Sequence, residues 1–321
     1  MTRGYRWNKL GLVFSPDTQY AWMTTHASVP TPLHLEGSIY RIYFSSRDEN
    51  GRSNIGFFDI DLTDPRNILE VSRKPVLSPG PLGFFDDHGI YASCAVRHDR
   101  DIYLYTIGWN PGPRAPLFYS SIGLAISTDG GASFEKYGVS PIMARSDHDP
   151  CLVTAPMVIK AAENWRMWYV SGIEWREIDG ELRSTYHIKY AESLDGIDWQ
   201  RDGRICIDHE NEGETNISRT CVVTTQNGYQ AWYSYSSGCG YRIGCAESSD
   251  GLSWTREDDR AGIEPSADGW DSLAQAYPYV VSYGVQMFMF YNGNKFGLDG
   301  VGLAVADIEA EREETEGEGV K

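Results

Sequence analysis

The segment WNKLGLVF (residues 7–14) has the pattern of a single β-strand from a repeat whose other copies lie far along the chain. Three later phrases, at 133–142, 198–207 and 253–263, carry an aromatic residue near the start and a similar apolar ending. Each of these phrases follows an Asp-Gly turn, whereas no such turn precedes residue 7. We therefore expect the N-terminal strand to complete a repeat that begins near the other end of the chain.

A larger unit is repeated five times. Each copy joins a strand of small residues, Val and Pro to an aromatic strand through a polar turn. The copies occupy residues 28–46, 91–108, 153–172, 217–236 and 275–293. The alternation of Tyr103 and Tyr105 with Leu104 is the period of two that β-strands require, because successive side chains point to opposite faces.

A third and a fourth strand follow in the repeat, separated by an SxDG turn in three of the copies. Asp-Gly favours a tight hairpin because both residues tolerate a positive φ, so we interpret this phrase as a structural turn. The fifth copy ends near Asp307, after its third strand. Residues 7–14 would supply the missing strand. The predicted fold is an all-β, five-bladed β-propeller with four antiparallel strands per blade, closed by the N-terminal strand. A β-sandwich of similar hairpins is the alternative.

Composition sets the domain organisation and excludes some partners. A chain of 321 residues with 41% hydrophobic content suits two ordinary domains or one large all-β domain. The repeats favour one domain over residues 5–308, and residues 309–321 are expected to form an acidic disordered tail. A net charge of −17 argues against nucleic acid or an anionic membrane as partner, because both would be repelled.

The location of the protein and the state of its cysteines are predicted from patterns that the sequence lacks. The N-terminus lacks a basic start with an apolar core, and no apolar run approaches the roughly 18 residues of a membrane span, so a cytoplasmic location is expected. The cysteines show no metal-ligand spacing, which favours buried free thiols. They are Cys94, Cys151, Cys206, Cys221, Cys239 and Cys245.

Carboxylates precede the first strand of four repeats at a nearly constant spacing. They stand five or six residues before the aligned positions Ser93, Ala155, Arg219 and Tyr277. The carboxylates are Asp87, Asp149, Glu214 and Asp271, with Asp86 as a competitor for Asp87. The first repeat offers Trp22 and His26 instead. In a propeller these segments converge at one end of the channel, so we expect Asp87, Asp149 and Glu214 to face one opening.

Such a group of carboxylates suits the hydrolysis of a glycosidic bond. One carboxylic acid protonates the leaving oxygen, while a second carboxylate activates water or attacks the anomeric carbon. A third carboxylate nearby raises the pKa of the acid by like-charge repulsion.

The repeats together with DDHGIYASCAV (86–96) and HDPCLVTAP (148–156) resemble the five-bladed glycoside hydrolases related to families 43 and 32, with families 68 and 130 as further relatives. HDP is similar to the RDP motif of family 32, whose Asp stabilises the transition state. Family 43 uses an Asp base, an Asp that tunes the pKa and a Glu acid, in chain order. The resemblance thus implies Asp87 as base, Asp149 as modulator and Glu214 as acid. Those families place the first Asp on blade one, where this chain has His26.

Further residues are candidates for substrate binding. Arg219 and Tyr277 lie at equivalent positions of first strands, and an arginine there requires a partner such as Glu214 or an anionic substrate group. Trp109 and Trp175 each follow a second strand and could stack on a sugar. The remaining candidates are His26, Asp271 and Glu174, the last as a reserve acid.

The predicted activity is that of a glycosidase acting on a small oligosaccharide or glycoside, without a required cofactor and without a metal in the site. By resemblance, some relatives hold calcium near a channel histidine, so His26 is a candidate for contact with such an ion. Two alternatives are kept. One is a phosphorylase or glycosyltransferase of the family 130 type, which needs a cationic phosphate pocket. The other is a carbohydrate-binding propeller without catalysis.

Overall fold

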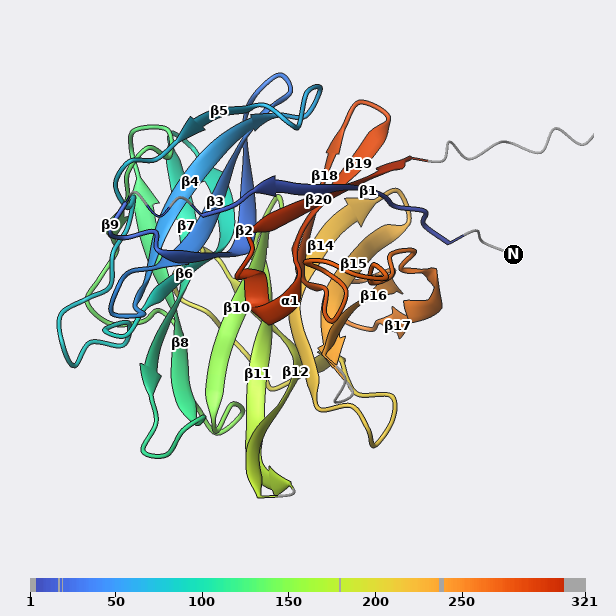
Figure 1. The fold of residues 1–321 in the computed structure, drawn as a ribbon. Coiled ribbons are helices and arrows are strands. Elements are labelled where there is room, and N and C mark those ends of the chain that lie inside the picture. Colours follow the sequence, from blue (N-terminus) through green and yellow to red (C-terminus); the bar gives the residue numbers. More distant parts are fainter. Residues whose placement is uncertain (1–3, 17, 19, 179, 237–239, 309–321) are drawn as a thin grey trace, which may run out of the picture.

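Strands dominate the architecture, as Figure 1 shows for a computed structural model of the chain. The structure describes residues 4–16, 18, 20–178, 180–236 and 240–308. Its helical segments within those ranges are the 3₁₀ turn η1 (Asp258–Arg260) and the short α1 (Asn294–Gly297). The all-β expectation is confirmed. The predicted acidic tail, 309–321, lies outside the described residues.

The strands form consecutive antiparallel groups of four. The first group contains β2 (Thr25–Glu36), β3 (Ile39–Arg47), β4 (Ser53–Asp61) and β5 (Ile68–Val71). The second contains β6 (Ile90–His98), β7 (Asp101–Pro111), β8 (Phe118–Ser127) and β9 (Glu135–Lys136). The third contains β10 (Leu152–Lys160), β11 (Trp165–Ile178), β12 (Glu181–Ser193) and β13 (Ile205–Ile207).

The last two groups complete the molecule. The fourth contains β14 (Asn216–Thr225), β15 (Gly228–Ser236), β16 (Tyr241–Ser248) and β17 (Thr255–Arg256). The fifth contains β18 (Ala276–Tyr283), β19 (Gln286–Asn292), β20 (Val301–Asp307) and the N-terminal β1 (Asn8–Phe14). The third and fourth groups share one eight-stranded sheet through a single parallel pairing of Tyr186 with Asn216.

The first strands of the groups contact one another in cyclic order. β2 contacts β6, β6 contacts β10, β10 contacts β14, β14 contacts β18, and β18 contacts β2 again. Each first strand pairs with the second strand of its own group on its other side. The segments that lead into these strands therefore approach a common centre.

The N-terminal strand joins the two ends of the described chain. β1 runs antiparallel to β20, with Leu12 opposite Gly302, and Figure 1 shows the two side by side. The Phe14 ring at the end of β1 stacks on Phe58 of the first group at 4.5 Å between centroids. Before β1, the Trp7 indole donates to the Ala261 carbonyl at 3.0 Å. This N-terminal region therefore contacts three groups, and the pairing expected from residues 7–14 is observed.

The SxDG phrases form tight turns, as the sequence indicates. In one of them the Ser127 hydroxyl bonds the Asp129 carboxylate at 2.7 Å, and that carboxylate accepts from the amides of Ala132 and Ser133. Gly131 adopts a φ of 89°, which an L side chain rarely takes. The turn is thus closed by its own side chains.

Five cysteines are free thiols, as expected: Cys94, Cys151, Cys206, Cys221 and Cys245. Four are buried and Cys151 is half-buried; the sixth, Cys239, lies outside the described residues. Among the described residues, none of the helices is long and apolar enough to cross a membrane.

Phe14→Ala should destabilise the protein by about 3 kcal/mol, because it removes a buried ring that packs β1 against the first group. Leu12→Ala on the same strand is the control, since Leu12 is 38% exposed, and it should change stability by less than about 1 kcal/mol. Urea unfolding followed by tryptophan fluorescence measures both. Equal, small effects would show that β1 does not fasten the chain ends.

Candidate functional site

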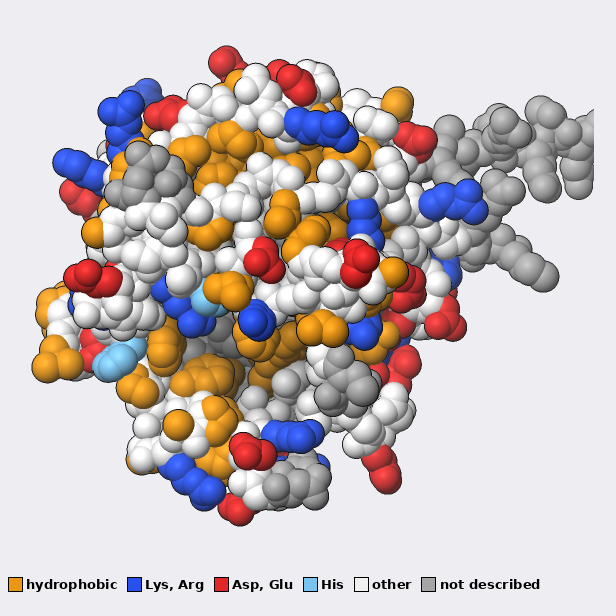
Figure 2. Space-filling model, in the orientation of Figure 1, with side chains coloured by type: hydrophobic (Ala, Val, Ile, Leu, Met, Phe, Trp, Pro, Cys, Tyr) orange, Lys and Arg blue, Asp and Glu red, His pale blue; other side chains and the backbone are white. Residues whose placement is uncertain are grey.

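A pocket of about 1100 Å³ lies where the first strands meet. Figure 2 shows a hollow below the centre of this face, bordered by hydrophobic side chains and by separate Lys and Arg side chains. Its aromatic lining consists of Tyr91, Trp109, Phe118, Trp175, Tyr186, Tyr241, Tyr277 and Phe296. Its cations are Arg47, Arg183, Arg219 and Lys295. None of the described residues that line it is Asp or Glu.

The first strands carry irregularities where they face the pocket. Pairing in β2, β10 and β18 shifts register across Val29, Ala155 and Tyr277, and these three residues have φ of 58°, 46° and 57°. Left-handed φ is uncommon outside glycine, and for a β-branched residue such as Val29 it is an outlier. Smaller register shifts occur in β6 and β14 at Ser93 and Arg219. These bulges interrupt the regular ladder and leave carbonyls for other donors.

Arg219 uses those carbonyls. Its guanidinium donates to the carbonyls of Pro30 at 2.9 Å, Ser93 at 3.0 Å and Tyr277 at 3.2 Å, and to the Thr31 hydroxyl at 3.1 Å. The side chain is 2% exposed and has no carboxylate within ion-pair distance among the described residues. Burial lowers the pKa of Arg219 to about 10, so it stays cationic at neutral pH. One side chain therefore ties β14 to β2, β6 and β18 and places a positive charge at the pocket.

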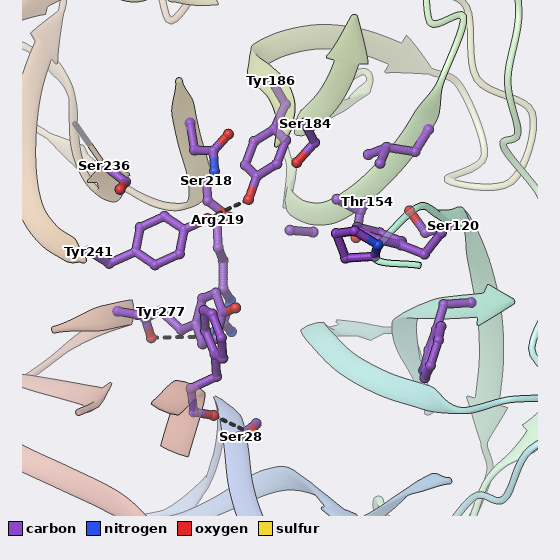
Figure 3. A pocket seen from close by; sticks show the side chains of 18 of the residues that line it. Ser28, Ser120, Thr154, Ser184, Tyr186, Ser218, Arg219, Ser236, Tyr241 and Tyr277 are labelled. Atoms are coloured by element: carbon purple, nitrogen blue, oxygen red, sulfur yellow. Dashed lines mark hydrogen bonds between the residues drawn. The ribbon is translucent and has the colours of Figure 1, made fainter. Parts of the chain in front are cut away.

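Phenol groups stand beside this cation. Figure 3 shows Tyr186, Tyr241, Tyr277 and Arg219 around a common space, and the hydroxyls of Tyr186 and Tyr241 are hydrogen-bonded to each other. Burial raises the pKa of all three phenols. They are therefore protonated at neutral pH and can each donate one hydrogen bond.

Arg47 stands close to this cluster, at the end of β3. Its charge lowers the pKa of Tyr277, opposing the larger effect of burial. Burial first, and then Arg47, lower the pKa of His26 to about 4, so His26 is neutral at pH 7. In the part of the chain that the structure describes, Arg47, Arg183 and Lys295 have no carboxylate partner. The pocket therefore combines unpaired cations with O–H donors, an arrangement suited to an anionic ligand.

Asp87, Asp149 and Glu214, which were expected to face one opening, are not among the residues that line the pocket. Asp149 is completely buried, and its Oδ2 lies 3.2 Å from Arg201 Nη1. Its Oδ1 lies 3.6 Å from Lys189 Nζ and accepts from the Tyr169 hydroxyl at 3.2 Å. Asp149 is thus neutralised inside its own group of strands.

Glu214 has an equivalent position in the fourth group. Its side chain is 3% exposed, and Arg256 of β17 donates to both carboxylate oxygens, at 2.6 and 2.9 Å. Burial raises the pKa of Glu214, but hydrogen bonds from Arg256 and from the Glu210 amide outweigh it, and the net pKa lies below its ordinary value. Arg219 does not contact Glu214, contrary to one of the two partners expected for it.

Asp271 and Asp86 complete the series. Asp271 is bound by Lys9 Nζ at 2.7 Å and by the Tyr291 hydroxyl at 3.0 Å, and Asp86 by Lys136 Nζ at 2.5 Å. In the second group Asp86, rather than Asp87, therefore corresponds to Asp149. In three groups, the cation that binds this carboxylate lies on the last strand of the same group. These cations are Lys136 on β9, Arg256 on β17 and Lys9 on β1. The carboxylates fasten the last strand of a group to the segment that leads into its first strand.

The other predicted residues divide into two sets. Arg219, Tyr277, Trp109 and Trp175 line the pocket, so their position agrees with the prediction. The remaining three do not line it. Asp87 accepts from the Gly83 amide at 2.7 Å and from His88 at 2.6 Å, Glu174 pairs with Arg176 at the surface, and His26 contacts Thr25.

Calcium does not fit the centre of the molecule. Arg219 fills the space between the first strands and takes the carbonyls that a cation would need. In addition, the described residues contain no group of three or more His, Cys, Asp or Glu side chains arranged to hold a metal ion.

Comparison with known proteins places the chain among relatives. No family model matches it. It is 39% identical over 301 residues to two uncharacterised proteins of Mycobacterium tuberculosis, MT1551 of strain CDC 1551 and Rv1502 of strain H37Rv, covering 94% of this chain and 99% of theirs. The chain belongs to their family. The fold of this chain is shared with solved structures that are much less similar in sequence.

Three of those structures are informative. The BT0996 complex with RGII has a TM-score of 0.72 at 18% identity, over 96% of this chain and 93% of its own. A thermostable family-43 glycoside hydrolase has a TM-score of 0.66 at 16% identity, over 87% of this chain and 88% of its own. The third structure is from the GH130 family of mannoside phosphorylases, which contains hydrolases of β-1,2-mannosidic linkages. It has a TM-score of 0.66 at 14% identity, over 94% of both proteins. The chain thus shares the fold of these glycoside hydrolases and of the GH130 protein, as the motifs suggested.

Asp149→Asn should lower the free energy of unfolding by about 3 kcal/mol, because it leaves Lys189 and Arg201 partly buried without their anion. Glu177→Gln is the matched control. It breaks an ion pair with Arg114 in which both side chains are more than half exposed, and should cost less than about 1 kcal/mol. Chemical denaturation at pH 7 compares the two. An Asp149 variant of unchanged stability would contradict the structural role.

Acid should destabilise the protein through Glu214 and Asp271. Both have a folded-state pKa below the ordinary value, so their contribution is present above the unfolded pKa of about 4 and is lost as pH falls through the folded pKa. Glu214→Gln should therefore be less stable than the wild type at pH 7 but lose less stability between about pH 5 and pH 3. Urea midpoints across that range measure the difference, and parallel curves would refute it.

Proposed function

We propose that this protein is a glycosyl-transferring enzyme that forms or cleaves the bond between a sugar and a phosphate in the central pocket. The supporting observation is the lining of that pocket, which pairs four cations with phenol and hydroxyl donors and includes no carboxylate among the described residues. The fold, shared with glycoside hydrolases and GH130 proteins, supports a glycoside as ligand.

The same proposal includes the architecture. The cyclic contacts of β2, β6, β10, β14 and β18 support a five-bladed propeller over a sandwich, because a sandwich places its strands in two stacked layers. The pairing of β1 with β20 supports closure of the last blade by the N-terminus. Residues 5–308 are then one domain.

A phosphate leaving group explains why a pocket with no carboxylic acid among its described lining residues can still act on a glycosidic bond. Cleavage of an ordinary glycoside needs a carboxylic acid because an alkoxide is a poor leaving group. A phosphate is far less basic, so it departs without being protonated, provided that cations and O–H donors stabilise its charge. Arg47, Lys295 and the phenol of Tyr277 are such groups.

The proposed step is balanced without a cofactor. The bond between the anomeric carbon and the phosphate oxygen breaks, and its electron pair leaves with the phosphate. A hydroxyl oxygen of the acceptor bonds to the anomeric carbon, and its proton is taken up by the phosphate once it has been released. The reverse direction is phosphorolysis of a glycoside.

Hydrolysis by Asp87, Asp149 and Glu214 is disfavoured. Asp149 and Glu214 are bound to cations inside their own groups, and none of the three lines the pocket. Bringing Glu214 to a sugar would separate it from Arg256 and leave that guanidinium without one of its anions. The walls formed by Trp109 and Trp175 suit the apolar face of a sugar in either mechanism.

The proposal is tested by presenting sugar 1-phosphates and nucleotide sugars with sugar acceptors, oligosaccharides with inorganic phosphate, and aryl glycosides without phosphate. We expect turnover only where a phosphate is a reactant. Arg47→Gln should lower kcat/KM on the order of 100-fold, because a donor to the developing charge is lost. Asp87→Asn should retain activity within about threefold, since Asp87 lies outside the pocket.

The alternatives give different results. Cleavage of aryl glycosides without phosphate, abolished by Asp87→Asn, would establish a carboxylate hydrolase and reject the proposal. Sugar binding with no turnover on any of the three substrate sets would establish a binding module instead.

A further inference from the structure

A strained turn stands at the rim of the pocket. In α1, Lys295 and Phe296 have φ of 52° and 60°, so two consecutive non-glycine residues adopt the left-handed region. Such a pair is disfavoured sterically and persists only where the surroundings fix it. Strain of this kind is concentrated at ligand-binding sites, which makes the turn a candidate for function.

Contacts from three segments fix the turn. The Ser28 hydroxyl of β2 donates to the Phe296 carbonyl. The Asn294 side-chain oxygen accepts from the amides of Leu273 and Ala274, at 2.8 and 3.0 Å. The Asn294 side-chain nitrogen donates to the Gly269 carbonyl at 2.9 Å. The turn is therefore held in one conformation.

The strained conformation presents a ring and a charge side by side. The Phe296 ring stacks on Tyr277, with 6.4 Å between centroids and 27° between planes, and meets Tyr241 edge-on at 6.1 Å. Phe296 is nevertheless 50% exposed, so the ring is not covered by this packing. Lys295 is exposed beside it, and both residues line the pocket.

Arg47 also lines the pocket, and it pairs across β2 and β3 with Thr25, three residues before the Ser28 whose hydroxyl holds the turn. Its charge acts on Tyr277, the ring on which Phe296 stacks, and on His26, which is two residues from Ser28. Lys295, Arg47, Phe296 and Tyr277 therefore all line the same pocket. A flat aromatic group bearing a short anionic chain would satisfy all of these residues at once.

We infer that the turn of residues 294–297, together with Arg47, is a subsite for the nucleoside diphosphate part of a nucleotide-linked sugar. The base would lie on the exposed face of Phe296, and the two phosphates would lie between Lys295 and Arg47. This inference rests on the proposed function, since it names the group that carries the phosphate.

The size of the pocket favours this ligand over a simple sugar phosphate. About 1100 Å³ exceeds the roughly 300–1000 Å³ typical for drug-sized ligands, and a monosaccharide phosphate would fill little of it. A lipid-linked sugar phosphate fits less well, because a chain with a net charge of −17 is repelled by an anionic membrane surface.

Isothermal titration calorimetry with the full chain tests the subsite through UDP, GDP, ADP and dTDP, with pyrophosphate as the probe without a base. At least one nucleoside diphosphate should bind about 10-fold or more tightly than pyrophosphate, because stacking on an aromatic ring adds to the charge interaction. Phe296→Ala should remove that advantage and leave pyrophosphate binding unchanged, whereas Phe296→Trp should keep it.

Two further variants separate the contributions. Lys295→Gln should weaken the nucleotide and pyrophosphate alike, by about 10-fold, because it removes a charge that both probes contact. Val139→Ala is the control, since Val139 is an apolar residue that is 70% exposed and does not line the pocket, and it should change neither affinity. Thermal unfolding of each variant verifies that it is folded.

The inference is overturned if no nucleotide binds more tightly than pyrophosphate, if Phe296→Ala weakens both probes equally, or if vesicles carrying a polyprenyl phosphate bind in preference to every nucleotide. The proposed function fails separately. Nucleotide binding that depends on Phe296, with no glycosyl transfer from any sugar phosphate, would reject the function and keep the subsite. Transfer from simple sugar 1-phosphates without a nucleotide preference would keep the proposed function and reject the subsite.

Discussion

The guanidinium of Arg219 is the interaction on which the arrangement of the first strands depends. Bulges leave the carbonyls of Pro30, Ser93 and Tyr277 facing the centre, and one side chain from β14 hydrogen-bonds all three. A buried polar group without a partner is costly, so removing the arginine would leave several acceptors unsatisfied at once. The same group gives the pocket a positive charge without a neutralising carboxylate among the described residues. One side chain therefore both links the first strands and adds positive charge to the pocket.

Charge is distributed by a simple rule in this fold. Asp86, Asp149, Glu214 and Asp271 lie within the groups of strands and are paired with cations. The cations of the pocket have no carboxylate partner among the residues that the structure describes. The pairing has a structural cause, because last strands such as β9 and β17 have only two residues and form few ladder hydrogen bonds. The strongly acidic chain thus presents a basic pocket. A fold shared with glycoside hydrolases accordingly does not imply their carboxylate chemistry in this chain.

The sequence predicted the fold better than the site. Alternation of aromatic residues and the repeated Asp-Gly turns are local signals, and they located the strands and the pairing of residues 7–14 with the C-terminal strand. The carboxylates were also recognised as equivalent, apart from the choice of Asp87 over Asp86. Their direction could not be predicted, because the partner of Asp271 is Lys9, 262 residues away, and that pairing exists only in the folded chain.

The pocket residues that the sequence did not predict share one feature, their place in the repeat. Arg47 and Tyr241 lie at the ends of second or third strands and Tyr186 lies within β12, so none of them falls in the segments that lead into first strands. Lys295 and Phe296 lie in a turn whose left-handed backbone has no glycine signature at those two positions. Arg219 and Tyr277 were found because they fall at aligned positions of the repeat. Repeats therefore reveal equivalent positions, but not which of them face the ligand.

A crystal structure with a bound sugar phosphate would show where the anion binds, independently of any measurement of turnover. We expect density for the phosphate in the central pocket, within hydrogen-bond reach of Arg47 or the Tyr277 hydroxyl, with the Glu214–Arg256 and Asp149–Arg201 pairs intact. A sugar bound beside Asp149 or Glu214, with those ion pairs opened, would contradict it.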